Sequence, residues 1–276
     1  MSDSMDAAQT WGAVAEAWEA NVDGLDDHTG EATAALLVRL AVQAGERVLE
    51  LAAGPGSLGA RWSELVGPAG TVLVSDISPA MVDAASRRNA ALTNVDTAVI
   101  DAAAIGRPDG SFDVVACRMG LMFTPDPSVA FAEIRRVLGP GGRFGALTWG
   151  GLEHNPWMTC VGMAAMANGL VGGGPPIGPG GIFSLGDPAA LEVLAKDAGF
   201  SDVTVEEIAI TFRSDSVDAH IEMVGSLAGP LAAVLDAASP EQLAAVRRTA
   251  ADLAAPYLTG DGLEIPGRAL LVAGRR

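Results

Sequence analysis

Residues 49–59, LELAAGPGSLG, connect a short apolar run, ERVLEL, to a run with helical periodicity. Gly54, Gly56 and Gly59 have the G-x-G-x-x-G spacing that is typical of dinucleotide-binding loops. A glycine loop between a strand and a helix brings backbone N–H groups close to a ligand. The Glu50 carboxylate would be badly placed against a pyrophosphate, and the Gly-Lys-Ser/Thr ending of a P-loop is missing. The loop therefore predicts a different ligand at Gly54 and Gly56, with Gly59 incidental in the first turn of a helix.

Apolar strands and helical runs alternate after the loop at the spacing of βαβ units. The expected strands lack polar–apolar alternation, which fits a parallel sheet that is covered on both faces. Ligands of such sheets bind at the carboxyl ends of the strands, and Asp76 and Asp101 each end one of them. The last two strands are expected to lie antiparallel at one sheet edge. The expected strands are residues 46–51, 71–76, 95–101, 111–118, 138–150 (a turn, then a strand), 203–212 and 264–274.

Helical periodicity and capping residues predict the helices between these strands. Residues 7–20 form an amphipathic helix with Trp11 and Trp18 on one face, and residues 21–30 form a turn-rich connection. Ser78, which a proline follows, is the expected N-cap of a helix. No second domain is expected, and the helices between the last two strands form an insertion over the active face. The other expected helices cover residues 31–43, 57–66, 127–138, 155–170, 187–199 and, as two or three helices, 215–256.

The composition describes an acidic globular protein. The chain has 276 residues, a formal net charge of −17 and 49% hydrophobic residues, so its surface would repel the phosphates of DNA or RNA. Cys117 and Cys160 form no C-x-x-C pair and no H-x-x-x-H motif occurs, so neither disulfides nor a metal site is expected. The start of the chain lacks the features of a signal peptide, and no apolar run reaches membrane-span length. We expect a cytoplasmic protein, either a monomer or a homodimer.

Five motifs in register extend the glycine loop into a family resemblance. E-L-A-A-G-P-G, D-I-S-P-A-M, D-A-A, F-D-V-V and L-G-P-G-G-R-F follow one another in this order. The chain thereby resembles the class I S-adenosylmethionine (SAM) dependent methyltransferases, in the small-molecule group related to ubiquinone/menaquinone-biosynthesis methyltransferases. The resemblance is strong over residues 45–150 and weaker elsewhere. It implies an α/β fold with a Rossmann-like, seven-stranded, mostly parallel sheet, helices on both faces, an antiparallel strand pair at the C-terminal edge and a helical lid insertion.

The resemblance also implies how one domain, residues 1–276, is organised. Methyltransferases of this group cover the cofactor with an N-terminal helical segment and bind the acceptor beneath a lid. The implied parts are an N-terminal helical cap at 1–44, a SAM-binding core at 45–150, an acceptor-binding lid region at 151–260 and a closing strand at 261–276.

The family's roles for the glycine loop carry over to matching positions. Glu50 takes the place of the acid that contacts the methionine amino group of SAM. Ala52, Gly54 and Gly56 belong to the loop that lets the cofactor lie against the backbone. Many relatives have cysteine or glycine at Ala52 and at the alanine after it, and both replacements are small enough for the loop to form. Asp76 matches the acid that binds both ribose hydroxyls, since two carboxylate oxygens can accept from two neighbouring hydroxyls.

The remaining cofactor positions lie after the later strands and in the cap. Trp18 belongs to the cap, where an aromatic face can approach the cationic sulfonium, although packing in the core is an equally ordinary role for it and for Trp11. The resemblance places Ile77 and Met81 beside the adenine, Asp101 and Ala102 at the adenine amino group, and Arg118 and Met119 at the methionine end.

Methyl transfer from a sulfonium needs a base only if the acceptor must lose a proton. His154, after the fifth strand, and His28, in the connection before the second helix, are the candidates, and a structural histidine is the alternative for both, as for His220. Phe123, Trp149 and Trp157 are candidates for the wall of an apolar acceptor pocket.

The expected activity is methyl transfer to a small, apolar acceptor, such as a quinone-like compound or another secondary metabolite. A SAM-binding protein of the same fold without methyl transfer, either a cyclase-type catalyst or a binding module, is the first alternative. An NAD enzyme is the second, although the later motifs and the closing strand pair do not belong to one.

Overall fold

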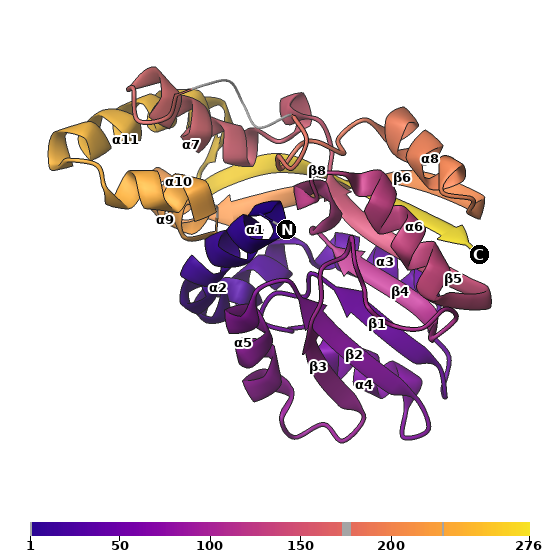
Figure 1. The fold of residues 1–276 in the computed structure, drawn as a ribbon. Coiled ribbons are helices and arrows are strands. Elements are labelled where there is room, and N and C mark those ends of the chain that lie inside the picture. The colour runs from indigo at the N-terminus through magenta and orange to yellow at the C-terminus, as the bar shows by residue number, and fades with distance from the viewer. Residues whose placement is uncertain (1, 173–177, 228) are drawn as a thin grey trace.

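One twisted β-sheet organises the chain in a computed structural model that describes residues 2–172, 178–227 and 229–276 (Figure 1). The strands are β1 Arg47–Leu51, β2 Thr71–Asp76, β3 Val95–Val99, β4 Phe112–Arg118, β5 Leu138–Trp149, β6 Ser201–Ser214, β7 Leu258–Thr259 and β8 Gly262–Arg275. They follow the order β3-β2-β1-β4-β5-β8-β6, with the short β7 paired to β8. The first five strands pair in parallel, and β8 is antiparallel to both β5 and β6. The predicted sheet is confirmed, with β7 as a small addition.

The strand order reverses between β1 and β4, because the chain builds β2 and β3 on one side of β1 and β4 and β5 on the other. A crevice for ligands forms at such a reversal, at the carboxyl ends of the strands. The glycine loop leaves β1 at this point. The fold therefore places the predicted ligand site between the ends of β1, β2 and β4.

Helices pack on both faces of the sheet. Figure 1 shows α6 in front of the strands and α3 and α4 behind them, and α5 packs against α4. The helices are α1 Ser2–Ala13, α2 Ala15–His28, α3 Gly30–Leu40, α4 Gly59–Val66, α5 Pro79–Asn89, α6 Pro127–Val137, α7 Pro156–Ala167, α8 Pro188–Asp197, α9 Val217–Leu227, α10 Gly229–Asp236 and α11 Pro240–Ala254, with the 3-10 turns η1 Leu121–Phe123, η2 Leu152–His154 and η3 Ala255–Tyr257. The predicted N-cap is confirmed, since the Met81 N–H donates to Ser78 Oγ at 3.4 Å.

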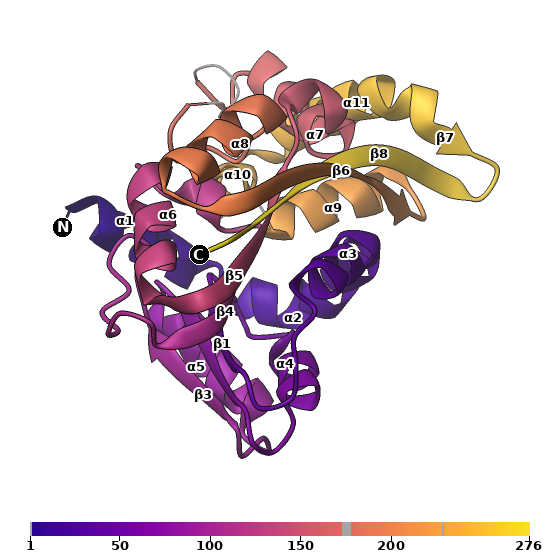
Figure 2. The same ribbon diagram turned by 90° about the vertical axis from the view of Figure 1, so that its right-hand side faces the viewer.

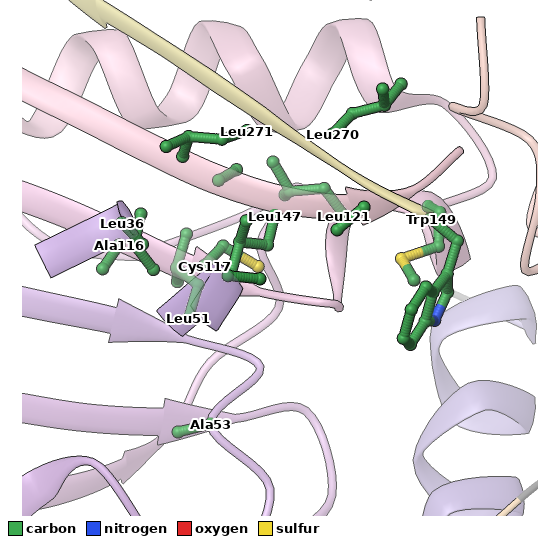
Figure 3. Close-up of a cluster of buried hydrophobic side chains, with 14 of the residues drawn as sticks. Leu36, Leu51, Ala53, Ala116, Cys117, Leu121, Leu147, Trp149, Leu270 and Leu271 are labelled. Atoms are coloured by element: carbon green, nitrogen blue, oxygen red, sulfur yellow. The ribbon is translucent and has the colours of Figure 1, made fainter. Parts of the chain in front are cut away.

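The buried core lies between these layers. Figure 3 shows Leu51, Cys117 and Leu147, which β1, β4 and β5 contribute to one cluster of buried side chains. All three are at most 1% exposed. A core packed at this density makes the sheet rigid. The candidate ligand site lies at the carboxyl ends of its strands.

The N-terminal segment differs from its prediction. Two helices, α1 and α2, meet at Val14, and α2 continues to residue 28 through the part that was expected to be a turn-rich connection. Local sequence favours a turn there because Gly24 and several aspartates are weak helix formers. Tertiary packing overrides that preference, because Val22 is 2% exposed and α2 contacts α3, α5, α9 and β6.

The C-terminal helices gather beyond the carboxyl edge of the sheet. In Figures 1 and 2, α7 and α9–α11 form one group, and Figure 1 places α1 and α2 between that group and the sheet. Contacts of α1 with α10 and of α2 with α9 join the two parts. In the described part of the chain, no helix is both long and apolar enough to cross a membrane.

Two aromatic residues that were predicted to line an acceptor pocket, Trp149 and Trp157, lie in the core instead. Trp149 and Trp157 are 5% and 3% exposed, and their ring centroids are 4.8 Å apart. The Trp157 ring also stacks on Phe212, with centroids 4.1 Å apart and planes at 15°. The faces of these rings pack against one another. The rings therefore join α7 to β5 and β6 and do not line a pocket.

Candidate cofactor site at the carboxyl ends of β1, β2 and β4

The site lies under the two N-terminal helices. A Cβ on Gly54 would lie 3.9 Å from Cε3 of Trp18, which puts the indole of α2 over the glycine loop. A Cβ on Gly12 of α1 would lie 3.5 Å from Oγ of Ser78, beside the end of β2. Trp11 contacts Trp18 edge-on at 6.0 Å between centroids. The cap therefore covers both halves of the predicted cofactor site.

The glycine loop needs its glycines for conformation and for space. Gly54 and Gly56 have φ angles of +56° and +72°, which glycine adopts without the steric cost of a side chain. A Cβ on Gly56 would lie 2.8 Å from Cβ of Ala85 and 2.8 Å from Nδ2 of Asn89. The loop therefore packs directly on α5, so only glycine fits at this point.

The third glycine is not incidental, and that prediction is wrong. A Cβ on Gly59 would overlap Oδ1 of Asn89, whose Nδ2 donates to the carbonyl oxygen of Gly56 at 3.0 Å. Gly59 starts α4, and Asn89 ends α5. The glycine thus permits the close approach of two helices that hold the loop between them.

Two residues other than glycine are strained at the strand ends. Ala52, after β1, has a φ of +50°, and Met119, after β4, has a φ of +57°. Such conformations cost free energy and gather at functional sites, where the surrounding structure enforces them. Gly120 accommodates this arrangement, because a Cβ there would overlap Cβ of Ala52.

Replacing Gly120 with alanine is expected to lower the free energy of unfolding by about 1–3 kcal/mol, the cost of overpacking a buried site. The backbone itself accepts alanine, since φ of Gly120 is −119°. Ala52→Gly in the same chain should recover a large part of the loss by removing the facing methyl group. Urea unfolding of both single variants and the double variant measures the coupling. Additive losses would contradict the predicted contact.

Asp76 ends β2 as a buried carboxylate that organises the backbone around it. Its Oδ2 accepts from the Gly54 N–H at 2.9 Å, and its Oδ1 accepts from the Ser78 N–H at 2.9 Å. Burial raises the pKa of Asp76, and these backbone donors oppose the rise. Each carboxylate oxygen has a second acceptor position, so Asp76 can also bind ligand hydroxyls.

Glu50 is the most isolated charge of the site. Its side chain is 1% exposed, and within the described residues its Oε2 has no hydrogen-bond partner. Burial raises the pKa of Glu50 to about 7, against the opposing effects of the Arg118 charge and the nearby Trp62 indole. The indole Nε1 lies close without hydrogen-bond geometry, so it also lacks a partner among these residues. Asp26 and Asp76 raise the pKa further by like-charge repulsion.

Arg118 connects the glycine loop to α2 by hydrogen bonds. Its Nη1 donates to Oδ1 of Asp26 on α2, and its Nη2 donates to Oγ of Ser57 in the loop at 2.7 Å. Both sequence and structure thus bring Arg118 to the loop. Asp26 and Ser57 were not predicted, although Asp26 follows Trp18 at helical spacing and continuing the helix through residue 26 would have revealed it.

The predicted adenine positions lie at the ends of β2 and β3. The Ile100 N–H donates to the carbonyl oxygen of Asp76 at 2.9 Å, which joins these ends. Oδ1 of Asp101 accepts from the Ala103 N–H at 2.8 Å in the turn that follows. Ile77 and Ala102 are half-buried, whereas Met81 is buried inside α5 at 2% exposure. One edge of the sheet thus holds Asp76, Ile77 and Asp101. Met81 is buried on α5.

The candidate histidines lie away from the glycine loop. His154 is exposed on η2, and its nearest charged partner is Glu153 at 3.4 Å. His28 ends α2 and is not in a connection as predicted: it stacks near Phe212 at 5.1 Å between centroids, and burial lowers its pKa. His220 is buried, with Nε2 2.6 Å from the carbonyl oxygen of Trp157. The described residues contain no cluster of three or more His, Cys, Asp or Glu side chains that could hold a metal ion.

Comparisons with known proteins agree with this geometry. Residues 48–142 match the family model of a methyltransferase domain. The chain is 37% identical over 116 residues to a ubiquinone/menaquinone biosynthesis C-methyltransferase UbiE of Pseudoalteromonas translucida, across 41% of this chain and 46% of that protein. It is 40% identical over 107 residues to UbiE of Hahella chejuensis, across 37% and 42% of the two chains. The matched region thus spans less than half the length of these relatives.

Solved structures share the fold over most of the chain. The YcgJ protein of Bacillus subtilis aligns with a TM-score of 0.57 at 20% identity, over 88% of this chain and 97% of its own. The [4+2]-cyclase SpnF aligns with a TM-score of 0.56 at 22% identity, over 89% and 79% of the two chains. Identities this low establish the fold alone. The family match places a methyltransferase domain at residues 48–142, and the solved structures show that the chain shares their fold.

Proposed function

We propose that this chain binds SAM at the ends of β1, β2 and β4 and transfers its methyl group to a small, apolar organic acceptor. The buried Glu50 carboxyl carries the proposal, because its Oε2 lacks a hydrogen-bond partner within the described residues. An unsatisfied buried carboxylate is costly. The ammonium of the methionine part of SAM would satisfy it.

The other residues of the edge fit the rest of the cofactor. Asp76 has acceptor positions for two ribose hydroxyls. Gly54 is half-buried where Trp18 lies over the loop, and Gly56, which is buried against α5, fixes the loop through its positive φ angle. Asp101, with Ile77 beside the same edge, would face the adenine. This set of acids and glycines suits a cationic, hydroxyl-rich ligand better than a pyrophosphate.

SAM carries its reactive methyl group on a sulfonium, so the protein has to position the reactants and supply electrostatics. The Trp18 indole lies over Gly54, where an aromatic face would attract the sulfonium. Trp11 packs edge-on against Phe123 at 4.8 Å between centroids, and both rings are half-buried. These aromatic surfaces support the proposal of an apolar acceptor that enters between the cap, residues 1–44, and the lid region, residues 151–260.

An acceptor that must lose a proton requires a base. The proposal keeps His154 and His28 for that role. Burial lowers the pKa of His28, which favours the neutral imidazole, the form that can accept a proton. Solvent exposure of His154 makes it free to turn toward an acceptor above η2.

The function is tested by incubating the protein with SAM and panels of quinone, phenol and amine acceptors while S-adenosylhomocysteine is measured by mass spectrometry. Formation of this product together with a methylated acceptor is expected. Tight SAM binding without turnover on any acceptor class would favour a SAM-binding protein of methyltransferase fold that does not transfer methyl groups. Binding of NADH in place of SAM would reject the proposal.

Replacing Asp76 with asparagine is expected to weaken SAM binding by about 1.5–3 kcal/mol, the range for hydrogen bonds to a charged group. Asparagine keeps a carbonyl acceptor for one of the two backbone N–H groups that Asp76 binds, and its amide group faces the other, so thermal unfolding of the variant is measured beside its SAM affinity. Calorimetry measures the affinity for SAM. Asp83→Asn, at an exposed position of α5, serves as the control. Equal SAM affinity in the Asp76 variant and the wild type would show that the ribose lies elsewhere.

A further inference from the structure

One face of α2 closes over the glycine loop. Trp18, Val22 and Asp26 are spaced four residues apart and therefore lie on one side of the helix. Val22 is 2% exposed, Trp18 lies over Gly54, and Asp26 binds Arg118. The helix thus meets the loop region at two points, and the second point is an ion pair.

The ion pair of Asp26 with Arg118 differs from its neighbours on α2. The side chains of Asp26 and Arg118 are 27% and 12% exposed. In the Asp23–Arg88 pair, one step outward, the aspartate is 81% exposed. Exposed pairs contribute little to stability, whereas a charge pair that is shielded from water is costly to break without a replacement partner. Arg118 therefore needs an anion in this position.

The proposed cofactor brings such an anion to the same place. The methionine part of SAM carries an ammonium and a carboxylate on one carbon atom. Arg118 is the positive charge that acts on Glu50, and its Nη2 is already fixed by Ser57 of the loop. An ammonium at Glu50 therefore puts the adjacent carboxylate within reach of the Arg118 guanidinium.

We propose that Asp26 holds the place of the cofactor's carboxylate on Arg118, so that α2 and SAM compete for one guanidinium. This inference rests on the proposed function. Binding of SAM replaces the Asp26 carboxylate on Arg118 with the carboxylate of the ligand and frees Asp26. Competition lowers the apparent affinity by the fraction of molecules in which Arg118 is available. Asp26 thereby acts as a positioning residue that sets cofactor affinity and product release.

The test compares three ligands that differ at the amino-acid end. SAM and S-adenosylhomocysteine carry the carboxylate, whereas methylthioadenosine has the same adenosyl part without it. Asp26→Asn is expected to tighten binding of the first two by roughly three- to tenfold and to leave methylthioadenosine unchanged. Arg118→Gln should weaken the first two and also spare the third. Asp23→Asn, on the same helix with an exposed partner, is the matched control and should change none of the three affinities.

Calorimetry at about pH 8.5 favours ionised Glu50 in the wild type and in Asp26→Asn, because loss of the Asp26 charge lowers the pKa of Glu50. In the Arg118→Gln background, Asp26→Asn should no longer change SAM affinity. Weaker or unchanged SAM binding by Asp26→Asn alone would overturn the inference, and so would an equal gain for methylthioadenosine, which would mean simple loosening of the cap. Failure of the wild type to bind SAM would reject the proposed function itself, a distinguishable result.

Discussion

Replacing Glu50 with glutamine is expected to stabilise the ligand-free protein by about 3 kcal/mol at pH 8 while it weakens SAM binding. Burial raises the pKa of this carboxyl from 4.5 to about 7. A raised carboxyl pKa means that the folded state holds its proton over a range in which the unfolded chain has lost it. Each pKa unit corresponds to about 1.36 kcal/mol, so the difference of about 2.5 units sets the size of the effect.

The sign follows from proton linkage. Between pH 4.5 and about 7 the unfolded state binds fewer protons than the folded state at Glu50, so this residue makes wild-type stability fall as the pH rises. Above pH 7 both states are ionised and the loss is complete. Glutamine has the same shape and no charge, so the advantage of Glu50→Gln should be absent near pH 4, grow through pH 5–7 and then level off.

Cofactor binding should respond in the opposite direction. An ionised Glu50 attracts the ligand ammonium, so wild-type SAM affinity should rise with pH up to about 7, and the glutamine variant should lose roughly tenfold or more at pH 8. Thermal unfolding from pH 4 to 8 and calorimetry with SAM measure the two effects. Glu64→Gln, on exposed α4 surface, is the control and should change neither. A lower melting temperature of Glu50→Gln than of the wild type at pH 8 would show that the Glu50 carboxylate does not destabilise the ligand-free protein.

The sheet and the glycine loop were predictable because local sequence and tertiary structure favour the same conformation there. The run that ends in Asp76 is largely apolar on both faces, and Ser78 followed by a proline starts a helix whatever surrounds it. Motif order also singled out Glu50 and Asp76, which the structure places on the neighbouring strands β1 and β2. Their burial and the missing partner of Glu50 depend on three-dimensional packing, which no spacing pattern contains.

The cap and the third glycine were mispredicted because long-range contacts decide them. Gly24 and its acidic neighbours suggest a turn, yet distant parts of the chain bury Val22 and pair Arg118 with Asp26, which holds this segment as a helix. Gly59 looked replaceable because its own backbone is helical, but Asn89 of another helix fills the space of its side chain. Sequence periodicity shows which side of a helix or strand is apolar. It does not show which distant residues pack against that helix or strand.

Gly56→Ala is expected to lower the free energy of unfolding by about 2–5 kcal/mol and to abolish SAM binding. Alanine at a φ of +72° is strained by about 1–2 kcal/mol. Its Cβ would also lie 2.8 Å from Cβ of Ala85 and 3.1 Å from Cα of the same residue, and overpacking adds about 1–3 kcal/mol. The backbone of α5 cannot move away without shifting Asn89, which binds the Gly56 carbonyl.

Gly141→Ala separates the two causes. Gly141 has nearly the same φ, +76°, and nothing lies within 4 Å of the position a Cβ would take. Alanine there should therefore pay only the conformational cost, about 1 kcal/mol, and leave SAM affinity unchanged. The excess loss in Gly56→Ala, measured by urea unfolding, then reports the contact between loop and helix. Equal losses at the two positions would mean that α5 does not support the loop, and the steric explanation for this glycine would fail.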